Sequence, residues 1–509
     1  MTDAIPQLGL DVVQSGAADT SGALLPSAQM LALPERAIQF GTGAFLRGFV
    51  DYFLDVANAQ GRFNGRVVAV GSTGSGRDRA FAEQDGLFTL VSRGLVAGKA
   101  REETRVIGSV SRALSASDDW SAVLECARNP QLSVIFSNTT EVGIALDESD
   151  APGFHPPKSF PGKLTRFLYE RARAFAFAPS KGLVVVPCEL IEGNGDTLRQ
   201  LVLDLAARWG YEPGFRHWIE HWVHFCNTLV DRIVPGAPGS DETALLTTRL
   251  GYTDALLTTA EQFRLFVIEG DDSLRARLDF ADADTGIVIT RDVGPYRERK
   301  LRLLNGAHTM AVSMALLAGC ESVRDAMVHP QVGTFIRRVQ LDEILPTVDA
   351  PDAEEFAHAT LDRFENPHIQ HLLTDITLHG TTKLRVRVVP ILVRAAAQRG
   401  RVPEGLALGF AAHLAYLRGD LQARRRASGQ AVPVDVAGDA VHARWVGVDV
   451  QQDASVRAFV QAVAADEALW GTDLGTLPGF VDSVTRHLAI ICTAGAERAL
   501  DALLTAGVA

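Results

Sequence analysis

The segment KLRLLNGAH brings a lysine, an asparagine and a histidine close together, as Lys300, Asn305 and His308. These residue types suit the reduction of a carbonyl group. A lysine with a lowered pKa can give a proton to the carbonyl oxygen as hydride arrives, and can accept it in the reverse direction. An amide can hold the charge that develops on oxygen, and a histidine can orient the substrate or tune the lysine. The alternative is structural, a basic segment beginning a helix, with Asn305 as a cap and His308 packed.

The spacing of these residues restricts how they act together. On an α-helix all three fit one broad face, but Lys300 and His308 would lie about 12 Å apart along the axis. That is too far for joint contact with one carbon atom, so we expect Lys300 in the turn that enters the helix. Asn305 precedes Gly306, a residue that costs about 1 kcal/mol relative to alanine inside a helix. This cost indicates a close approach to the backbone.

A pair of glycines lies between a short apolar run and a helical pattern, in FGTGAFLRGF. Gly41 and Gly43 permit a tight turn, and they let backbone N–H groups approach a dinucleotide pyrophosphate at the start of the helix. The spacing is only G-x-G, because Leu46 occupies the third glycine position of the usual motif. An ordinary strand-to-helix connection is the alternative. The residues predicted to bind the cofactor are Phe40, Gly41, Thr42, Gly43, Ala44, Phe45, Arg47, Ser72, Asn138 and Thr139.

The end of the second predicted strand leaves the choice between NAD and NADP open. A dehydrogenase specific for NAD usually offers an acidic residue there to the ribose 2′-hydroxyl. Here the strand runs into GSTGSGRDR, and the first acid is Asp78. The hydroxyl groups from Ser72 onward, with Arg77 nearby, suit a 2′-phosphate instead. A loop with a solvated arginine is an equally good interpretation.

Two further polar segments follow buried strands, where ligand groups gather in an open α/β sheet. After VVVP, Asn194 is either a second oxyanion donor or the asparagine of a turn or N-cap. Asn138 and Thr139 follow VIFS, and they either contact the cofactor or cap the next element. The residues alone leave both roles open.

Basic residues gather in two segments of a chain that is acidic as a whole. They are Arg291, Arg297, Arg299, Lys300 and Arg302 in the first, and Lys383, Arg385 and Arg387 in HGTTKLRVR. Cations concentrated around a site favour an anionic substrate. The alternative is that they form solvated helix or strand faces.

Three histidines recur in FRHWIEHWVH at helical spacing, as His217, His221 and His224. Three histidines on one helical face can ligate zinc. The segment lacks the H-E-x-x-H order and a second cluster of ligands, so we expect a packing face here and no metal site.

Short apolar runs alternate with helical patterns in the first half of the chain, at IQF, RVVAV, LSVIF and GLVVV. Strands that alternate with helices predict an α/β domain with a parallel sheet covered on both faces. After Pro295 mainly helical patterns follow. We therefore predict an α/β domain over residues 1–285 and a mostly α-helical domain over residues 286–509. Residues 1–35 are expected to form a surface lead-in, and residues 424–441 an exposed loop.

The composition restricts the class of protein. The 509 residues include 49 basic and 61 acidic ones, a formal net charge of −12 that repels phosphates, so we expect neither nucleic acid nor a membrane as a partner. With 47% apolar and 22% charged residues, the chain is globular rather than disordered. Five widely spaced cysteines suit a reducing compartment, and the N-terminus lacks a secretion signal. A cytoplasmic enzyme with a small-molecule substrate is the expectation.

At KLRLLNGAH the sequence resembles the polyol-specific long-chain dehydrogenase family, which includes mannitol dehydrogenase and the hexuronate reductases. The matching stretches run in order over most of the chain. They include IQFGTGAFLRGFVD, FSNTTEVGI, PCELIEGNGDTLRQLVL, PYRERKLRLLNGAHT and NPHIQHLLTDITLHGTTKLRVRVVP. The combination is far more specific than the glycine turn alone. GSTGSGRDR departs from the hexuronate reductases, which have a Pro-containing segment there.

The resemblance implies a Rossmann-type, doubly wound N-terminal domain, a helical C-terminal domain and a metal-independent mechanism with NAD, NADP being the alternative. By motif it implies that Lys300 is the general acid/base and that Asn194 and Asn305 form the oxyanion hole. His308 would bind substrate or assist the lysine. Lys383, in the family's G-x-x-K segment, would contact substrate hydroxyls or a carboxylate. The predicted substrate-binding residues are thus Lys383, His308 and Asn305.

The activity implied by the resemblance is reversible reduction of a keto sugar acid, D-tagaturonate to D-altronate, by hydride from NADH. A relative acting on neutral polyols such as mannitol or arabinitol is the first alternative. The basic segments favour the acid, because a neutral polyol needs no counter-charge. A non-catalytic dinucleotide-binding regulator is a second alternative, and Lys300 argues against it because a regulator needs no proton donor. The chain has no G-x-S-x-G motif or Cys–His signature of a hydrolase.

Overall fold

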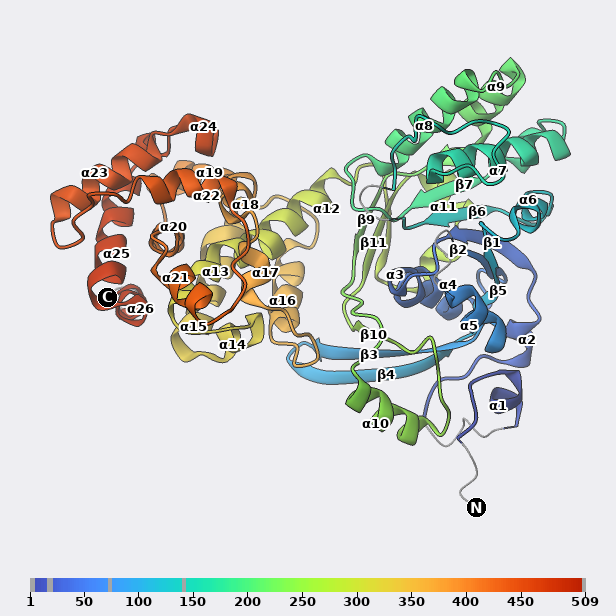
Figure 1. The fold of residues 1–509 in the computed structure, drawn as a ribbon, viewed down its shortest axis with the longest axis horizontal. Helices are drawn as coiled ribbons and strands as arrows, with labels where there is room; N and C mark the ends of the chain where they lie inside the picture. The colour runs from blue at the N-terminus through green and yellow to red at the C-terminus, as the bar shows by residue number, and fades with distance from the viewer. Residues whose placement is uncertain (1–4, 16–21, 72–75, 140–142, 506–509) are drawn as a thin grey trace. The chain divides into compact units, whose positions relative to one another are not determined.

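The protein forms two compact units (Figure 1). The computed structural model describes residues 5–15, 22–71, 76–139 and 143–505. The first unit comprises residues 1–94 and 100–293, and the second comprises residues 95–99 and 294–509.

The second unit begins later than the boundary we placed between residues 285 and 286. A break there would separate strand β12 (Ile287–Thr290) from its parallel partner β11 (Leu265–Glu269). The main chain therefore leaves the first unit only after this strand pair is complete, at Gly294.

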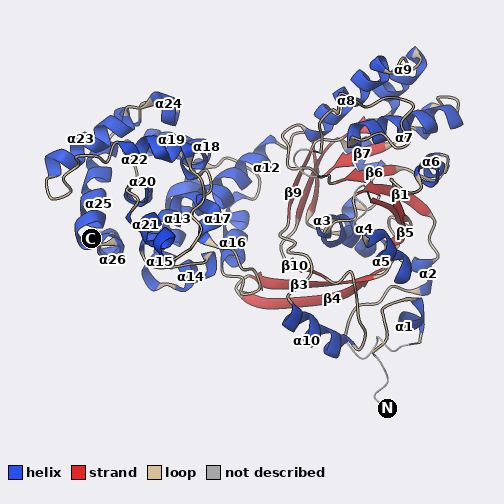
Figure 2. Cartoon of the chain, in the orientation of Figure 1, coloured by secondary structure: helices blue, strands red, loops and turns tan. Residues whose placement is uncertain are grey.

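The main sheet of the first unit has six strands, in the order β5-β2-β1-β6-β7-β8. Figure 2 shows strands in red, with β1, β5, β6 and β7 of this sheet labelled. Every neighbouring pair in it is parallel. Winding starts at β1 and proceeds to both sides, which is the doubly wound arrangement predicted by the resemblance. The strands are β1 (Glu35–Phe40), β2 (Arg66–Gly71), β5 (Val110–Ser115), β6 (Val134–Ser137), β7 (Val184–Pro187) and β8 (His224–Phe225).

Both faces of this sheet are buried, which confirms the prediction from the short apolar runs. Along β1, Ile38 and Phe40 pack in a core with one set of helices, while Ala37, which precedes Ile38, packs in a second core on the other face. The first core is covered by α6 (Trp120–Ala127), α7 (Phe160–Ala174), α8 (Asn194–Arg208) and α9 (Pro213–Trp222). The second is covered by α3 (Ala44–Gly48) and α4 (Val50–Ala59).

Two small sheets in the first unit were largely missed by the sequence analysis. One has the order β10-β3-β4, and the other has the order β12-β11-β9. The remaining elements of the unit are β3 (Phe88–Val96), β4 (Lys99–Ile107), β9 (Thr228–Asp231), β10 (Thr258–Glu261), α5 (Arg77–Glu83), α10 (Ser240–Leu250), α11 (Asp272–Arg277), η2 (Pro179–Lys181) and η3 (Ala281–Ala283).

The segment before β1 is more than a surface lead-in. It contains two short helices, α1 (Leu10–Gln14) and α2 (Ala28–Leu31). Leu8 is fully buried and Val12 nearly so, in a core shared with Leu87 of the first unit. The prediction was wrong because these anchors are too few to form a periodic pattern.

The second unit is helical, as predicted. Its central helix α20 is apolar on every side, which is typical of a helix buried all round. The helices are α12 (Gly294–Arg299), η4 (Lys300–Gly306), α13 (Ala307–Leu317), α14 (Val323–Val328), α15 (Pro330–Arg338), η5 (Val339–Ile344), η6 (Leu345–Thr347), α16 (Ala353–Phe364), α17 (Leu373–Thr377), α18 (Gly380–Arg387), α19 (Val389–Arg399), α20 (Glu404–Leu417), α21 (Asp420–Ala427), α22 (Val436–Ala443), α23 (Asp453–Ala464), α24 (Glu467–Trp470), η7 (Leu474–Thr476), α25 (Phe480–Ala494) and α26 (Ala496–Thr505).

The loop predicted at residues 424–441 is shorter than expected. Residues 424–427 complete α21, because arginines in a last turn are favoured by the negative end of the helix dipole. Residues 436–441 already belong to α22. Within the described ranges, no helix combines the length and the apolar character needed to cross a membrane.

Candidate active site

The glycine turn joins β1 to α3 at the carboxyl end of the main sheet. Gly41 has a φ of 134°, a conformation that favours glycine. A Cβ atom there would lie 2.9 Å from Leu46 Cδ1 and 3.1 Å from the carbonyl oxygen of Asn138. At Gly43 an added Cβ would meet nothing within 4 Å. A side chain at Gly41 would therefore clash with its neighbours, whereas the space next to Gly43 is free.

Arg47, predicted to supplement the charge at this turn, is buried behind it. Its Nη1 donates to the carbonyl oxygen of Thr42 at 2.7 Å, and its Nε donates to Thr258 Oγ1 at 3.1 Å. Burial lowers the pKa of Arg47 to about 10, which leaves the guanidinium charged at neutral pH. These bonds make Arg47 a support of the turn from inside the unit.

A buried glutamate ties the ends of β6 and β7 together. Glu189 accepts hydrogen bonds from the backbone N–H and the hydroxyl of Thr139, both at 3.0 Å, and from Ser137 Oγ at 3.0 Å. Burial raises the pKa of Glu189. Asn138 Nδ2 donates to the carbonyl oxygen of Cys188 at 2.8 Å. Asn138 and Thr139 are thus fixed at the strand ends. That they contact the cofactor stays a prediction.

Asn194 begins α8 and is fully buried. Its Nδ2 lies within hydrogen-bond distance of the carbonyl oxygens of Pro187 and Glu189, at 3.2 and 3.1 Å, and of Thr228 Oγ1 at 2.9 Å. Its Oδ1 accepts from the N–H groups of Gly195 and Thr228, both at 2.9 Å. Both amide hydrogens are taken up inside the unit, where they hold the strand-to-helix junction.

Two residues bear on the choice between NAD and NADP, Ser72 and Arg77, and the structure describes one of them. Ser72 lies outside the described residues. Arg77 is the first residue of α5, where it is exposed.

Lys300 lies inside a helix and not in a turn. The helix continues from α12 through the π-helical segment η4 into α13. Hydrogen bonds in a π-helix join residues five apart, so Lys300 and Asn305 lie on successive turns of the same side. The prediction of a turn was wrong. It rested on the long axial distance between Lys300 and His308 in a regular α-helix, and it did not foresee the π-helical segment. Single π-helical turns are frequent at functional sites.

Asn305 differs from Asn194 in the state of its side chain. Its backbone carbonyl accepts a hydrogen bond from Thr309 Oγ1 at 2.8 Å, and Arg387 Nη1 donates to the same hydroxyl at 3.2 Å. The half-buried side-chain amide of Asn305 has no hydrogen-bond partner in the described part of the chain. It is therefore available to a ligand.

The ring of His308 is fixed by two other rings. It stacks on Phe364 with centroids 4.0 Å apart and an interplanar angle of 19°, and it is nearly perpendicular to His371 at 5.1 Å and 86°. Its Nε2 is buried without a hydrogen-bond partner among the described residues. Burial first, and then the neighbouring charges of His371 and Arg363, lower the pKa of His308 well below 6.5. His308 is therefore neutral at neutral pH.

Lys383 and Arg387 lie four residues apart on α18, on one side of the helix. Lys383 Nζ donates to the carbonyl oxygen of Ile376 at 3.1 Å. Burial and the charge of Arg387 lower the pKa of Lys383. We refer to His308, His371, Lys383 and Arg387 as the basic cluster.

The start of α18 is held by a buried network. Asp435 accepts hydrogen bonds from the N–H and the hydroxyl of Thr381, at 2.9 and 2.8 Å. His413 Nε2 lies 3.0 Å from the same hydroxyl, and its Nδ1 lies 3.4 Å from Ser313 Oγ. Burial lowers the pKa of His413 to about 4, so it is a neutral partner in this network.

The other predicted basic segment is mainly structural. Arg302 is buried, pairs with Glu298 at 2.9 Å and donates to the carbonyl oxygen of Arg387 at 2.8 Å. Arg299 is also buried, and it lies 4.5 Å from the ring centroid of Phe356. These arginines brace η4 and α18.

The histidines of the FRHWIEHWVH segment do not share one helical face. His217 and His221 lie on α9 with ring centroids 4.0 Å apart, whereas His224 begins strand β8. Across the described ranges, no group of three or more metal-ligating side chains is arranged to hold an ion.

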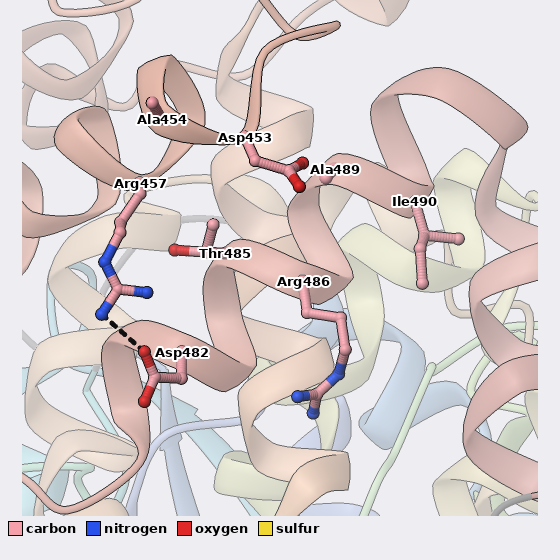
Figure 3. Close-up of a pocket in the computed structure, with 8 residues that line it drawn as sticks. All are labelled: Asp453, Ala454, Arg457, Asp482, Thr485, Arg486, Ala489 and Ile490. Atoms are coloured by element: carbon pink, nitrogen blue, oxygen red, sulfur yellow. Dashed lines mark ion pairs between the residues drawn. The ribbon is translucent and has the colours of Figure 1, made fainter.

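A separate hollow lies between α23 and α25 (Figure 3). It is bridged by an ion pair between Arg457 and Asp482 at 2.6 Å, and Arg486 on its rim pairs with Glu404. None of the predicted site residues lines it.

Two residues at the candidate site were missed by the sequence analysis. Glu189 directly follows the buried run VVVPC, and an acid at that place in a strand-end segment is the signal that would have identified it. His371 lies in the quoted stretch NPHIQHLLTDITLHG, but its place depends on how α13, α16 and α18 pack.

The comparisons with known sequences cover both units. Residues 35–281 match the mannitol dehydrogenase Rossmann domain, and residues 292–492 match the mannitol dehydrogenase C-terminal domain. The altronate oxidoreductase of Bacillus subtilis (strain 168) is 42% identical over 468 residues, which cover 92% of this chain and 95% of the relative. The altronate oxidoreductase of Klebsiella pneumoniae (strain 342) is 41% identical over 473 residues, covering 92% and 97%.

Solved structures agree with this similarity. The ternary complex of Pseudomonas fluorescens mannitol 2-dehydrogenase with NAD and D-mannitol gives a TM-score of 0.66 at 26% identity, covering 98% of this chain and 99% of that one. A substrate-free D-sorbitol dehydrogenase gives a TM-score of 0.73 at 22% identity, covering 98% and 100%, which is a likeness of fold.

Proposed function

The chain belongs to the mannitol dehydrogenase family, and we propose that within this family it reduces a keto sugar acid, D-tagaturonate, reversibly to D-altronate with NADH. Its family and its relatives make it an oxidoreductase that acts on a CH–OH group of a polyol or sugar acid. The observation that carries the finer proposal is the 42% identity to an altronate oxidoreductase over 92% of the chain.

NAD is the cofactor that fits the glycine turn. The backbone at Gly41 is pressed against its neighbours, and Gly43 leaves open space in front of it, as the approach of a pyrophosphate requires. Bound there, NADH would supply hydride to the ketone carbon. Asn138 and Thr139, fixed at the neighbouring strand ends, are further proposed contacts.

We assign proton transfer to Lys300. During reduction its Nζ gives a proton to the ketone oxygen, and during oxidation it takes the proton of the altronate hydroxyl. Asn305, on the same side of η4, donates from its side-chain amide to the same oxygen. Because a lysine supplies the proton and an amide steadies the oxyanion, the proposed reaction needs no metal ion.

The remaining assignments follow from the state of each side chain. His308, with its ring fixed and its Nε2 unpaired within the described ranges, binds a substrate hydroxyl. Lys383 binds a substrate hydroxyl or the carboxylate. Asn194 can act as a second oxyanion donor only if one of its amide hydrogens leaves a present acceptor.

A neutral polyol is the second candidate substrate, because the mannitol 2-dehydrogenase complex aligns with nearly the whole chain. The basic cluster favours the acid. Lys383 and Arg387 form no direct ion pair with a carboxylate among the described residues, although Asp435 lies near Lys383. A bound carboxylate would supply a direct counter-charge, which a neutral ligand would not.

The test is the absorbance of NADH or NADPH during incubation with purified protein and a panel of keto sugars and keto sugar acids. Rapid oxidation of NADH with tagaturonate and little with fructose would support the proposal. Preference for neutral ketoses would assign the protein to the polyol branch. Cofactor binding without turnover of any substrate would favour a regulator.

A further inference from the structure

His371 is a member of the basic cluster that no motif assignment covers. It lies in the segment that leads into α17, and its ring contacts His308 at a centroid distance of 5.1 Å. Lys383 of α18 is close enough for its charge to oppose protonation of His371. His371 thus lies beside two of the predicted substrate-binding residues.

The position of His371 is fixed by the backbone on both sides. Its carbonyl oxygen accepts a hydrogen bond from the N–H of Val323 at 3.0 Å, and the N–H of Leu373 donates to the carbonyl oxygen of Glu321 at 2.9 Å. Leu372 between them pairs with Ser322 in an antiparallel bridge. The side chain is half-buried, so its cost of ordering is already met before a ligand binds.

The charges around His371 lack a direct ion pair, although Asp375 lies near its ring and Asp435 near Lys383. In the described part of the chain no member of the basic cluster forms an ion pair with an acid, although the protein carries a net charge of −12. Asp375 favours protonation of His371, while burial and Lys383 oppose it, and the net effect is a lowered pKa. A bound carboxylate would add the missing negative charge and favour the imidazolium.

We propose that His371, together with Lys383, binds the carboxylate of the substrate and so selects a sugar acid over the corresponding neutral ketose. This inference rests on the proposed function. A carboxylate accepts charge-assisted hydrogen bonds from an imidazolium and an ammonium, whereas the CH₂OH group of a neutral ketose offers no charge to either. His308, held against His371, then contacts the hydroxyl groups next to the carboxylate end.

The test compares two substrates that differ only at this end, tagaturonate and tagatose. His371→Phe keeps a ring against His308 and removes both nitrogens, and His358→Phe, on the exposed side of α16, is the matched control. We expect His371→Phe to raise KM for tagaturonate about tenfold or more, since a charge-assisted contact is lost. The values for tagatose, and both sugars with the control variant, should stay within roughly threefold of wild type.

A second measurement does not depend on turnover of the neutral sugar. Calorimetric titration of altronate into the protein saturated with NADH should give a Kd raised about tenfold in His371→Phe and unchanged in the control. If the phenylalanine variant does not fold, His371→Asn replaces it in both experiments. Equal losses for both sugars, or no loss for tagaturonate, would overturn the role of His371. A wild-type protein that turns over only neutral ketoses and does not bind altronate would instead overturn the proposed function.

Discussion

The two units prepare their predicted ligand positions in opposite ways. In the first unit the polar side chains of Arg47, Glu189 and Asn194 are bonded inward, and they hold the backbone that borders open space at Gly43. In the second unit two polar groups lack a partner among the described residues, the half-buried side-chain amide of Asn305 and the buried Nε2 of His308. The first arrangement suits a cofactor contacted by main-chain groups, and the second suits a substrate contacted by side chains.

The two asparagines make the contrast specific. Each precedes a glycine at a place where the resemblance implies an oxyanion donor. Asn194 has both amide hydrogens taken up and is fully buried, whereas Asn305 is half-buried and its amide is unpaired within the described ranges. The same residue type therefore contributes to the stability of one unit and is available for chemistry in the other.

The largest expected effect is that of Lys300. Lys300→Ala should lower turnover by about 10²–10⁴-fold, because the proton donor is lost while the glycine turn is untouched. NADH affinity, followed by quenching of protein fluorescence, should stay close to wild type. Lys163→Ala, in the first unit, is the control for loss of a lysine. Near-normal turnover of Lys300→Ala would remove Lys300 from the acid/base role.

Replacing each asparagine by alanine should affect a different property, kcat for Asn305 and the free energy of unfolding for Asn194. Asn305→Ala should lower kcat by about 10²-fold with little change in the thermal midpoint, since it removes a donor to the oxyanion. Asn194→Ala should lower the free energy of unfolding by about 3 kcal/mol or more, because several buried groups lose their partners. The measurements are steady-state kinetics and thermal unfolding of both variants. If Asn305→Ala changed only the thermal midpoint and not kcat, Asn305 would be a structural residue, and the proposed difference between Asn305 and Asn194 would be wrong.

The fold could be predicted where burial produces a periodic pattern. Apolar runs separated by helical patterns identified the parallel sheet, and the motif segments identified the family, which the comparisons confirm. The anchors Leu8 and Val12 escaped notice because isolated buried residues carry no period. In the two small sheets, β9 and β10 have only four residues each, and the nine-residue strands β3 and β4 show no alternation of buried and exposed positions.

The candidate site could be predicted in its residue types but not in its geometry. Apolar spacing does not encode the hydrogen-bond register of η4, so the π-helical segment that carries Lys300 and Asn305 was not expected. The place of His371 depends on contacts between separate helices, which one sequence does not reveal. The inward bonds of Arg47 likewise depend on Thr258, which lies far away in the chain.

Substitutions in the glycine turn should have smaller effects, and they test whether the first unit binds the cofactor through its main chain. Gly41→Ala should cost about 1–3 kcal/mol of stability because of its backbone conformation, and its Cβ would displace Leu46 or Asn138. Gly43→Ala has an extended backbone and free space, so stability should change by less than about 0.5 kcal/mol. Its methyl group should nevertheless weaken NADH about tenfold if the pyrophosphate occupies that space. Unchanged NADH affinity in Gly43→Ala would mean that the cofactor does not lie against this turn.

Acid should affect the two units differently, because their histidines differ. The histidines of the first unit, His155, His217, His221 and His224, have exposed side chains, although partial burial lowers the pKa of His224. In the second unit burial lowers the pKa of His413 to about 4 and that of His308 well below 6.5. Below pH 6.5 the unfolded chain therefore binds protons that the folded second unit does not, so stability is complete above pH 6.5 and falls as the pH drops toward about 4.

The size of this effect is set by linkage, at about 1.4 kcal/mol per pH unit for each buried histidine. Thermal unfolding between about pH 7 and pH 5 should show a decrease in midpoint that is smaller in His413→Asn than in wild type, because one titrating group is gone. His217→Asn should keep the wild-type pH dependence, since its ring is exposed in both states. If wild type, His413→Asn and His217→Asn had the same pH dependence, the acid sensitivity would come from groups other than His413 and its partners Thr381 and Ser313. The contrast between the units would then concern how ligands are contacted, and not how protons are bound.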